Sequence, residues 1–125
     1  MAKSVHDDVL DAALNYIKTY TTRISVCSAQ PTSYTEATST YKLAIKTISS
    51  ANFTGPANGD TSGRKVTSSE HADITIDSSG TASHVALSDS ANSKLLFVTT
   101  CTNQALVATN TVTIPAWDIE LSDPS

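Results

Sequence analysis

The sequence contains few charged and few aromatic residues. Charged residues make up 16% of the chain and aromatic residues 6%, and the Asp and Glu residues leave a formal net charge of −4. Proteins that bind nucleic acid do so largely through clustered Lys and Arg, which release counterions from the phosphates. The few basic residues here are scattered along the chain. We therefore expect no nucleic-acid partner.

Long apolar stretches are also missing. No segment approaches the roughly 20 apolar residues that a membrane-spanning helix needs, and residues 1–8 lack the apolar core of a signal peptide. We expect that the protein has no membrane partner and that it is synthesised in a cytoplasm. The length of 125 residues, without an evident linker, predicts a single domain over residues 1–125.

Cysteine is scarce, with only Cys27 and Cys101 present. Each lies within an expected strand, where a small apolar thiol packs well, so we expect free thiols. The alternative is a disulfide that joins an early strand to a late one across a long loop. Neither cysteine has a second Cys or His at ligand spacing, so we expect no metal site and no cofactor.

Ser and Thr are abundant instead, at roughly 30% of the residues, well above the usual composition of a globular domain. Thr is β-branched and suits a pleated, half-exposed surface. A surface of Ser and Thr stays soluble without charge and can pack against another protein at a low desolvation cost. The composition therefore favours strands.

The N-terminal segment predicts an amphipathic helix over about residues 5–18. Ser4 can cap it, and Asp7 and Asp8 suit the positive end of its dipole. Its apolar residues recur at steps of three and four: Val5, Val9, Leu10, Ala13, Leu14 and Ile17. This stripe either covers a sheet of the same chain or docks on a neighbouring subunit.

Alternating strand patterns fill the chain between about residues 22 and 122, interrupted by a long Gly-rich loop at about 52–64. In the last strand, Trp117, Ile119 and Leu121 share one face. Short strands at this spacing predict a mainly β domain, an antiparallel β-sandwich preceded by one N-terminal α-helix. An immunoglobulin-like sandwich and a barrel are the two architectures left open.

Two short motifs invite a catalytic or metal-binding interpretation and support neither. The segment Asp60-Thr-Ser-Gly63 departs from the Asp-Thr/Ser-Gly triplet of aspartic proteases by one inserted residue, and no histidine is tied to Ser62 as a base. Glu70, His71 and Asp73 could ligate a cation, but neighbouring positions of a strand point to opposite faces. We expect no catalytic residues and no enzyme.

Contact with other proteins is the remaining role, and two regions are the candidates. Long loops in compact domains are often contact-making elements, and a lone Trp can anchor either a core or an interface. The candidate interface residues are Phe53, Asn58, Asp60, Arg64 and Trp117.

Several stretches together resemble a group of small virion proteins of tailed bacteriophages. They are Asp11-Ala-Ala-Leu-Asn-Tyr-Ile17, Arg23-Ile-Ser-Val-Cys-Ser-Ala-Gln-Pro31, Tyr34-Thr-Glu-Ala-Thr38, residues 53–65, Ala86-Leu87 together with Leu96-Phe-Val-Thr-Thr-Cys101, and Pro115-Ala-Trp-Asp-Ile-Glu-Leu121. The resemblance covers nearly the whole chain, and its motifs are structural. It implies a location in the virion, assembled in the cytoplasm of a host bacterium.

The resemblance leaves the place in the particle open. We expect a capsid decoration or cement protein that binds the major capsid protein, or other virion proteins, and repeats as a homo-oligomer by symmetry. A neck, collar, connector or tail component is the first alternative. A receptor- or glycan-binding module on a fibre, using Tyr34, Tyr41 and Trp117, is the second.

Overall fold

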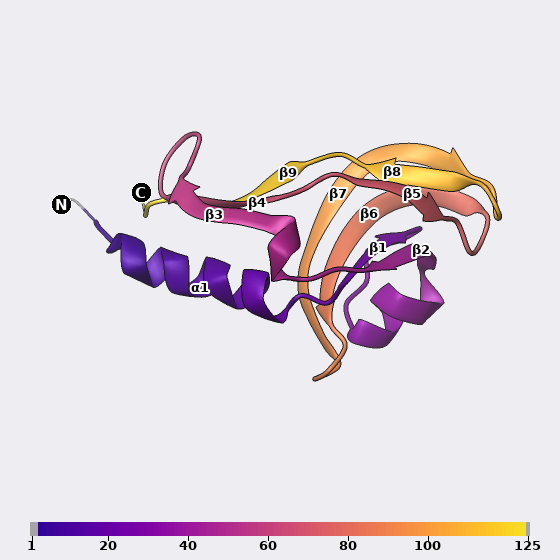
Figure 1. Ribbon diagram of the computed structural model, residues 1–125, viewed down its shortest axis with the longest axis horizontal. Coiled ribbons are helices and arrows are strands. Elements are labelled where there is room, and N and C mark those ends of the chain that lie inside the picture. Colours follow the sequence, from indigo (N-terminus) through magenta and orange to yellow (C-terminus); the bar gives the residue numbers. More distant parts are fainter. Residues whose placement is uncertain (1–2, 125) are drawn as a thin grey trace.

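A computed structural model describes residues 3–124 of the chain, and it is mainly β with one N-terminal helix (Figure 1). The strands are antiparallel, so the expected fold class is confirmed. The elements in chain order are α1 (Asp7–Tyr20), β1 (Arg23–Cys27), η1 (Glu36–Thr40), β2 (Lys42–Thr47), η2 (Ser50–Asn52), β3 (Phe53–Asn58), β4 (Arg64–Ser68), β5 (His71–Thr75), β6 (Gly80–Asp89), β7 (Lys94–Leu106), β8 (Thr111–Ile114) and β9 (Trp117–Leu121).

The largest sheet has the strand order β2-β1-β6-β7. Its two long strands, β6 and β7, form a hairpin that arches across the molecule (Figure 1). The β6–β7 register shifts twice. Ala82 pairs with Gln104 and His84 with Thr100, so β7 has extra residues around Cys101–Asn103, and a smaller shift adds Leu96. Such bulges bend a strand and turn its side chains.

Four of the other strands, β4, β5, β8 and β9, form one long two-stranded ribbon that runs along the top of Figure 1. β4 pairs with β9, from Arg64 opposite Leu121 to Ser68 opposite Trp117, and β5 pairs with β8. A short break divides the ribbon where Ser69 and Glu70 follow β4 and where Pro115 and Ala116 precede β9. β3 extends the β4–β9 half into a sheet of order β3-β4-β9.

The ribbon is joined to the large sheet along one side. Ala44 of β2 forms a bridge with Ile76, and the backbone N–H of Asp77 donates to the Leu43 carbonyl at 2.7 Å. The strands therefore follow one another in space as β7, β6, β1, β2, β5 and β8. The large sheet and the ribbon curl around a shared apolar core. The first and last strands of this series, β7 and β8, therefore lie on either side of an opening.

Helix α1 covers the β3-β4-β9 sheet of its own chain. Leu14 is fully buried at 0% exposure, and Ile17 packs against the same core. The apolar stripe is split, however, because Val9 is 61% exposed. The helix begins at Asp7 and not near Val5, since the Nδ1 atom of His6 accepts the Asp8 N–H at 3.0 Å and caps it in place of Ser4.

The prediction of a long Gly-rich loop at residues 52–64 is wrong. Residues 53–58 form strand β3, and only a tight turn around Gly59–Gly63 joins it to β4. Pro56 is compatible with this strand because β3 lies at the edge of its sheet, where a missing N–H breaks no ladder. Gly63 has a φ of +68° and approaches the Leu121 carbonyl closely, which explains the glycine there.

The apolar core is continuous from α1 to β8. Ile24, Leu87, Val66 and Ile119 are each at most 1% exposed, and Trp117 and Leu121 pack against the same cluster. The alternation predicted for the last strand is confirmed. A smaller cluster of Cys27, Ala37 and Ala86 lies on the other face of the large sheet.

Candidate functional site

The structure places four of the five candidate interface residues in positions that stabilise the chain itself. Phe53 is only 4% exposed and belongs to the core. The prediction that Phe53 is an interface residue is therefore wrong for the isolated chain. Arg64 donates to Asn58 Oδ1 and to Asp11 Oδ1, each at 2.8 Å, and so fastens the β3–β4 hairpin to helix α1. Asp60 is exposed at the hairpin tip and forms an ion pair with Lys65 at 2.7 Å.

Trp117 is the candidate residue that lies at a concave surface. It begins β9, beside the opening between the large sheet and the ribbon. Within residues 3–124, β7 pairs only with β6, β8 only with β5, and β9 only with β4. The facing edges of β7 and of β8–β9 therefore have no strand between them. We call this opening the seam.

The seam contains two adjoining hollows, of about 260 and 340 Å³. They share four lining residues from three strands and the following turn, Val85, Cys101, Ile114 and Pro115, and so form one trough. The other lining residues are Val26, Ala82, Thr99, Thr100, Thr102, Gln104, Leu106, Val112, Thr113, Trp117 and Asp118. Nearly all of these side chains are apolar or carry only a hydroxyl or amide.

An aromatic pair spans the seam close to the larger hollow. The rings of Phe97, on β7, and Trp117, on β9, have centroids 5.9 Å apart and are tilted by 31°. The indole N–H of Trp117 is buried and has no acceptor. An indole N–H can only donate a hydrogen bond, and a buried donor without an acceptor costs free energy. Trp117, beside the seam, thus has an unmet donor.

The single acidic residue of the trough, Asp118, is already engaged. Its carboxylate accepts from the Thr67 hydroxyl at 2.7 Å and from Lys65 Nζ at 3.3 Å. These contacts, with the Thr67 bond the largest, lower the pKa of Asp118 below its ordinary value. The trough therefore offers an incoming group little free charge.

Both thiols are free, as expected from the sequence, and they differ in environment. Cys27 is fully buried, and its burial raises the pKa of the thiol to about 11. Cys101 is half-buried in the trough, and burial raises its pKa as well. A thiol with a raised pKa is protonated at neutral pH and lacks the nucleophilic thiolate.

The histidines are separated from one another and serve local roles. His71 is 1% exposed with an unpartnered Nε2, and burial, with a smaller contribution from Lys46, lowers its pKa. His84 pairs with the Ser83 hydroxyl at 2.8 Å. Glu70 is exposed while His71 is buried, so the two do not share a face. In the part of the chain that the structure describes, no three His, Cys, Asp or Glu side chains gather at metal-binding distance.

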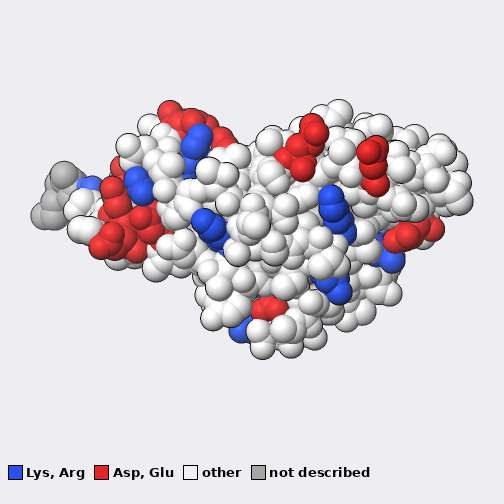
Figure 2. Space-filling view, in the orientation of Figure 1, with Lys and Arg blue, Asp and Glu red and all other residues white. Residues whose placement is uncertain are grey.

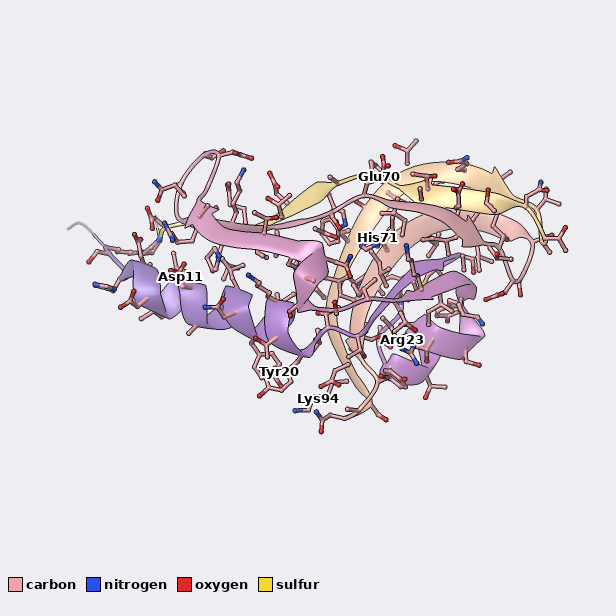
Figure 3. All side chains as sticks on the ribbon, in the orientation of Figure 1. Asp11, Tyr20, Arg23, Glu70, His71 and Lys94 are labelled. Atoms are coloured by element: carbon pink, nitrogen blue, oxygen red, sulfur yellow. The ribbon has the colours of Figure 1, made fainter. Side chains whose placement is uncertain are left out.

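A second apolar surface lies on the outer side of α1. Val9, Tyr16 and Tyr20 are 61%, 41% and 44% exposed. The two tyrosine rings lie 4.5 Å apart, and Lys94 Nζ donates to the Tyr16 hydroxyl at 3.4 Å. Tyr20, at the end of α1, and Lys94, at the turn of the β6–β7 hairpin, lie on the same side of the molecule (Figure 3).

Sequence patterns missed the seam because it depends on which distant strands pair. One signal was available: Lys94 is the only charged residue among the 13 of β7. In Figure 2, Asp and Glu side chains gather at the end of the molecule where α1 begins, and most of the remaining surface in this view is uncharged.

Comparisons with family models, curated proteins and solved structures found no match to this chain. Between residues 3 and 124, none of the helices has the length and apolar character required to cross a bilayer.

Proposed function

We propose that this chain is a non-enzymatic structural subunit of a tailed-bacteriophage virion, and specifically a capsid decoration protein that binds the outer surface of the capsid. The resemblance of its sequence stretches to small virion proteins supports the virion location. The surface of the fold supports a role in assembly, and a particle subunit of this kind needs no cofactor.

The observation that carries the proposal is the open edge of β7. Edge strands of soluble proteins are usually short or protected by charge and proline, because unpaired backbone groups recruit other chains. β7 has 13 residues, contains no proline and carries one charge at its start. Its bulges leave an uninterrupted paired run at Phe97–Thr100. An edge of this kind suits pairing with another protein.

The proposed partners are the major capsid protein or other virion proteins, with copies of the chain repeated by the symmetry of the particle. Nucleic acid is not among the proposed partners. The acidic side chains at the start of α1 (Figure 2) would repel phosphates, and the net charge is −4.

A glycan-binding role has less support from the surface. Such a site needs exposed aromatic rings around a shallow depression. Tyr34 and Tyr41 are half-buried, Tyr41 packs against the small core cluster, and Trp117 stacks near Phe97. The aromatic residues that a fibre module would use are therefore engaged within the chain.

The test is the copy number of this chain in purified virions, measured by quantitative mass spectrometry against the major capsid protein. Decoration predicts a ratio fixed to the capsid lattice, near one copy per capsid protein or per capsomer. A single ring of copies would reassign the chain to the neck, collar, connector or tail. Virions that lack the chain would overturn the proposal.

A further inference from the structure

We propose that the seam between β7 and β8–β9 binds an extended, uncharged segment of a different protein, which adds a strand to the free edge of β7. The identity of that protein as a virion neighbour rests on the proposed function. The strand-binding chemistry rests on the seam itself and can be tested without a virion.

The backbone of the seam selects a polypeptide in extended conformation. A strand at a sheet edge presents alternate N–H and C=O groups outward, and β7 and the β8–β9 side each have a free edge here. Strand addition satisfies such groups with main-chain hydrogen bonds, and pockets for alternate side chains add specificity. The β7 residues from Phe97 through Leu106 pair with the eight residues Gly80–Leu87 of β6. They therefore offer a path of about 26 Å, at 3.3 Å per residue of β6.

The side chains of the seam select an uncharged segment. Asp118 is the only charged residue that lines the trough, and Lys65 and Thr67 already bind it. A charge brought into this trough would lose its hydration without gaining a counter-charge. Two hollows of about 260 and 340 Å³ suit small β-branched apolar side chains at alternate positions.

Trp117 supplies a further feature that suits a peptide. Its buried indole N–H has no acceptor within the chain. A backbone carbonyl of the added strand would meet this need once binding turns the indole N–H toward the trough, because the carbonyl has two lone pairs and one can remain in the strand ladder. A purely hydrocarbon ligand would leave the donor unpaired.

A second copy of the chain is a poorer occupant than a different protein. Among residues 3–124, the strands already pair within the fold. The segment ahead of α1 contains Lys3 and His6, and the segment after β9 contains Asp123 and Pro124. Neither is an uncharged extended donor. Pairing of two β7 edges would bring the whole β6–β7 hairpin of the second copy to the trough, because β6 holds β7 in its own sheet.

The first experiment is a titration of the full chain with a capped peptide of about eight residues that alternates Thr and Val and ends in Lys. Trp117 is the only tryptophan and lines the seam, so its fluorescence reports occupancy. We expect a saturable change in emission. The matched control peptide is N-methylated at alternate residues, which removes the N–H groups of one edge, and we expect binding weaker by at least about tenfold. Equal binding of both peptides, or no change up to millimolar peptide, overturns the proposal.

Two variants locate the binding. Thr113 and Thr111 are both exposed on β8, but only Thr113 lines the trough. Thr113→Lys should weaken peptide binding about tenfold or more because it places a charge in the trough, whereas Thr111→Lys should leave it nearly unchanged. Circular dichroism verifies that both variants are folded. Equal effects of the two variants would place the peptide elsewhere and overturn the seam as its site.

The last experiment separates the seam from the proposed virion role. At alkaline pH, where the thiolate can form, maleimide should label the half-buried Cys101 in the free chain, whereas the fully buried Cys27 should react far more slowly. In virions that contain the chain, we expect Cys101 to be protected about tenfold or more, and crosslinking from this residue to reach a different protein. Unchanged labelling, or crosslinks only to another copy, overturns the strand proposal even where the virion location holds. Absence from virions overturns the location alone, because the peptide titration stands independently.

Discussion

The aromatic rings of Phe97 and Trp117 join two sheets that share no backbone ladder in this part of the fold, at a centroid distance of 5.9 Å. The pair packs on the common core and lies beside the seam. Trp117→Ala should lower the free energy of unfolding by about 2 kcal/mol, less than for a fully buried Trp because the residue is only partly buried. Urea denaturation followed by circular dichroism measures it. Tyr20→Ala is the control and should change stability little; equal losses would contradict the bridging role.

Helix α1 has one face that stabilises the chain and one that does not. Leu14 is fully buried and Val9 is 61% exposed. Leu14→Ala should cost about 3 kcal/mol of unfolding free energy, because it removes buried methyl groups and leaves a cavity. Val9→Ala on the same helix should change stability by less than about 0.5 kcal/mol. A large loss from Val9→Ala in the isolated chain would show that the outer face packs internally.

The turn of the β3–β4 hairpin requires a glycine at position 63. Its φ is +68°, and an added Cβ would overlap the Leu121 carbonyl oxygen. Gly63→Ala should therefore destabilise the chain by about 2 kcal/mol. Thr61→Ala, in the same exposed turn, should have little effect and is the control. Thermal unfolding of both variants tests this prediction, and equal melting temperatures would contradict it.

His71 should make stability depend on pH below its ordinary pKa of 6.5. Burial lowers its pKa below the ordinary value of 6.5, so the folded chain binds fewer protons than the unfolded chain in this range. Its contribution is complete above pH 6.5 or so and is lost as the pH falls through the lower folded pKa. Urea midpoints at several pH values should show a decline that His71→Gln reduces. His84→Gln is the matched control and should retain it; an unchanged slope in His71→Gln would contradict the assignment.

Local patterns predicted the helix and the last strand well. The three- and four-residue spacing around Leu14 arises because one face of a helix packs on the core, and the alternation around Ile119 arises because one face of a strand does. Each pattern depends on a single element, so it can be recognised in the sequence. The loop expected at 52–64 failed for a different reason. Gly and Pro favour turns locally, but pairing with β4 makes an edge strand of this segment.

The candidate site was the least predictable part. Asn58 and Arg64 resembled exposed contact residues, but the Asp11 carboxylate from a helix 53 positions away binds Arg64. Trp117 was identified because a lone Trp is informative by itself. Its neighbours in the seam come from β6, β7 and β8, and no local pattern encodes which edges remain unpaired.

The ribbon of β4–β5 with β8–β9 also governs how the chain can fold. Lys65 pairs with Glu120, and His71 with Ile114. These partners are far apart in the chain, so loop closure precedes any gain from pairing, and folding of such topologies takes milliseconds to seconds. On the ribosome, β4 stays without its β9 partner until residue 121 has been synthesised. The apolar strands made earlier must therefore wait, exposed to chaperones, until the late strands β8 and β9 pair with β5 and β4 and close the core.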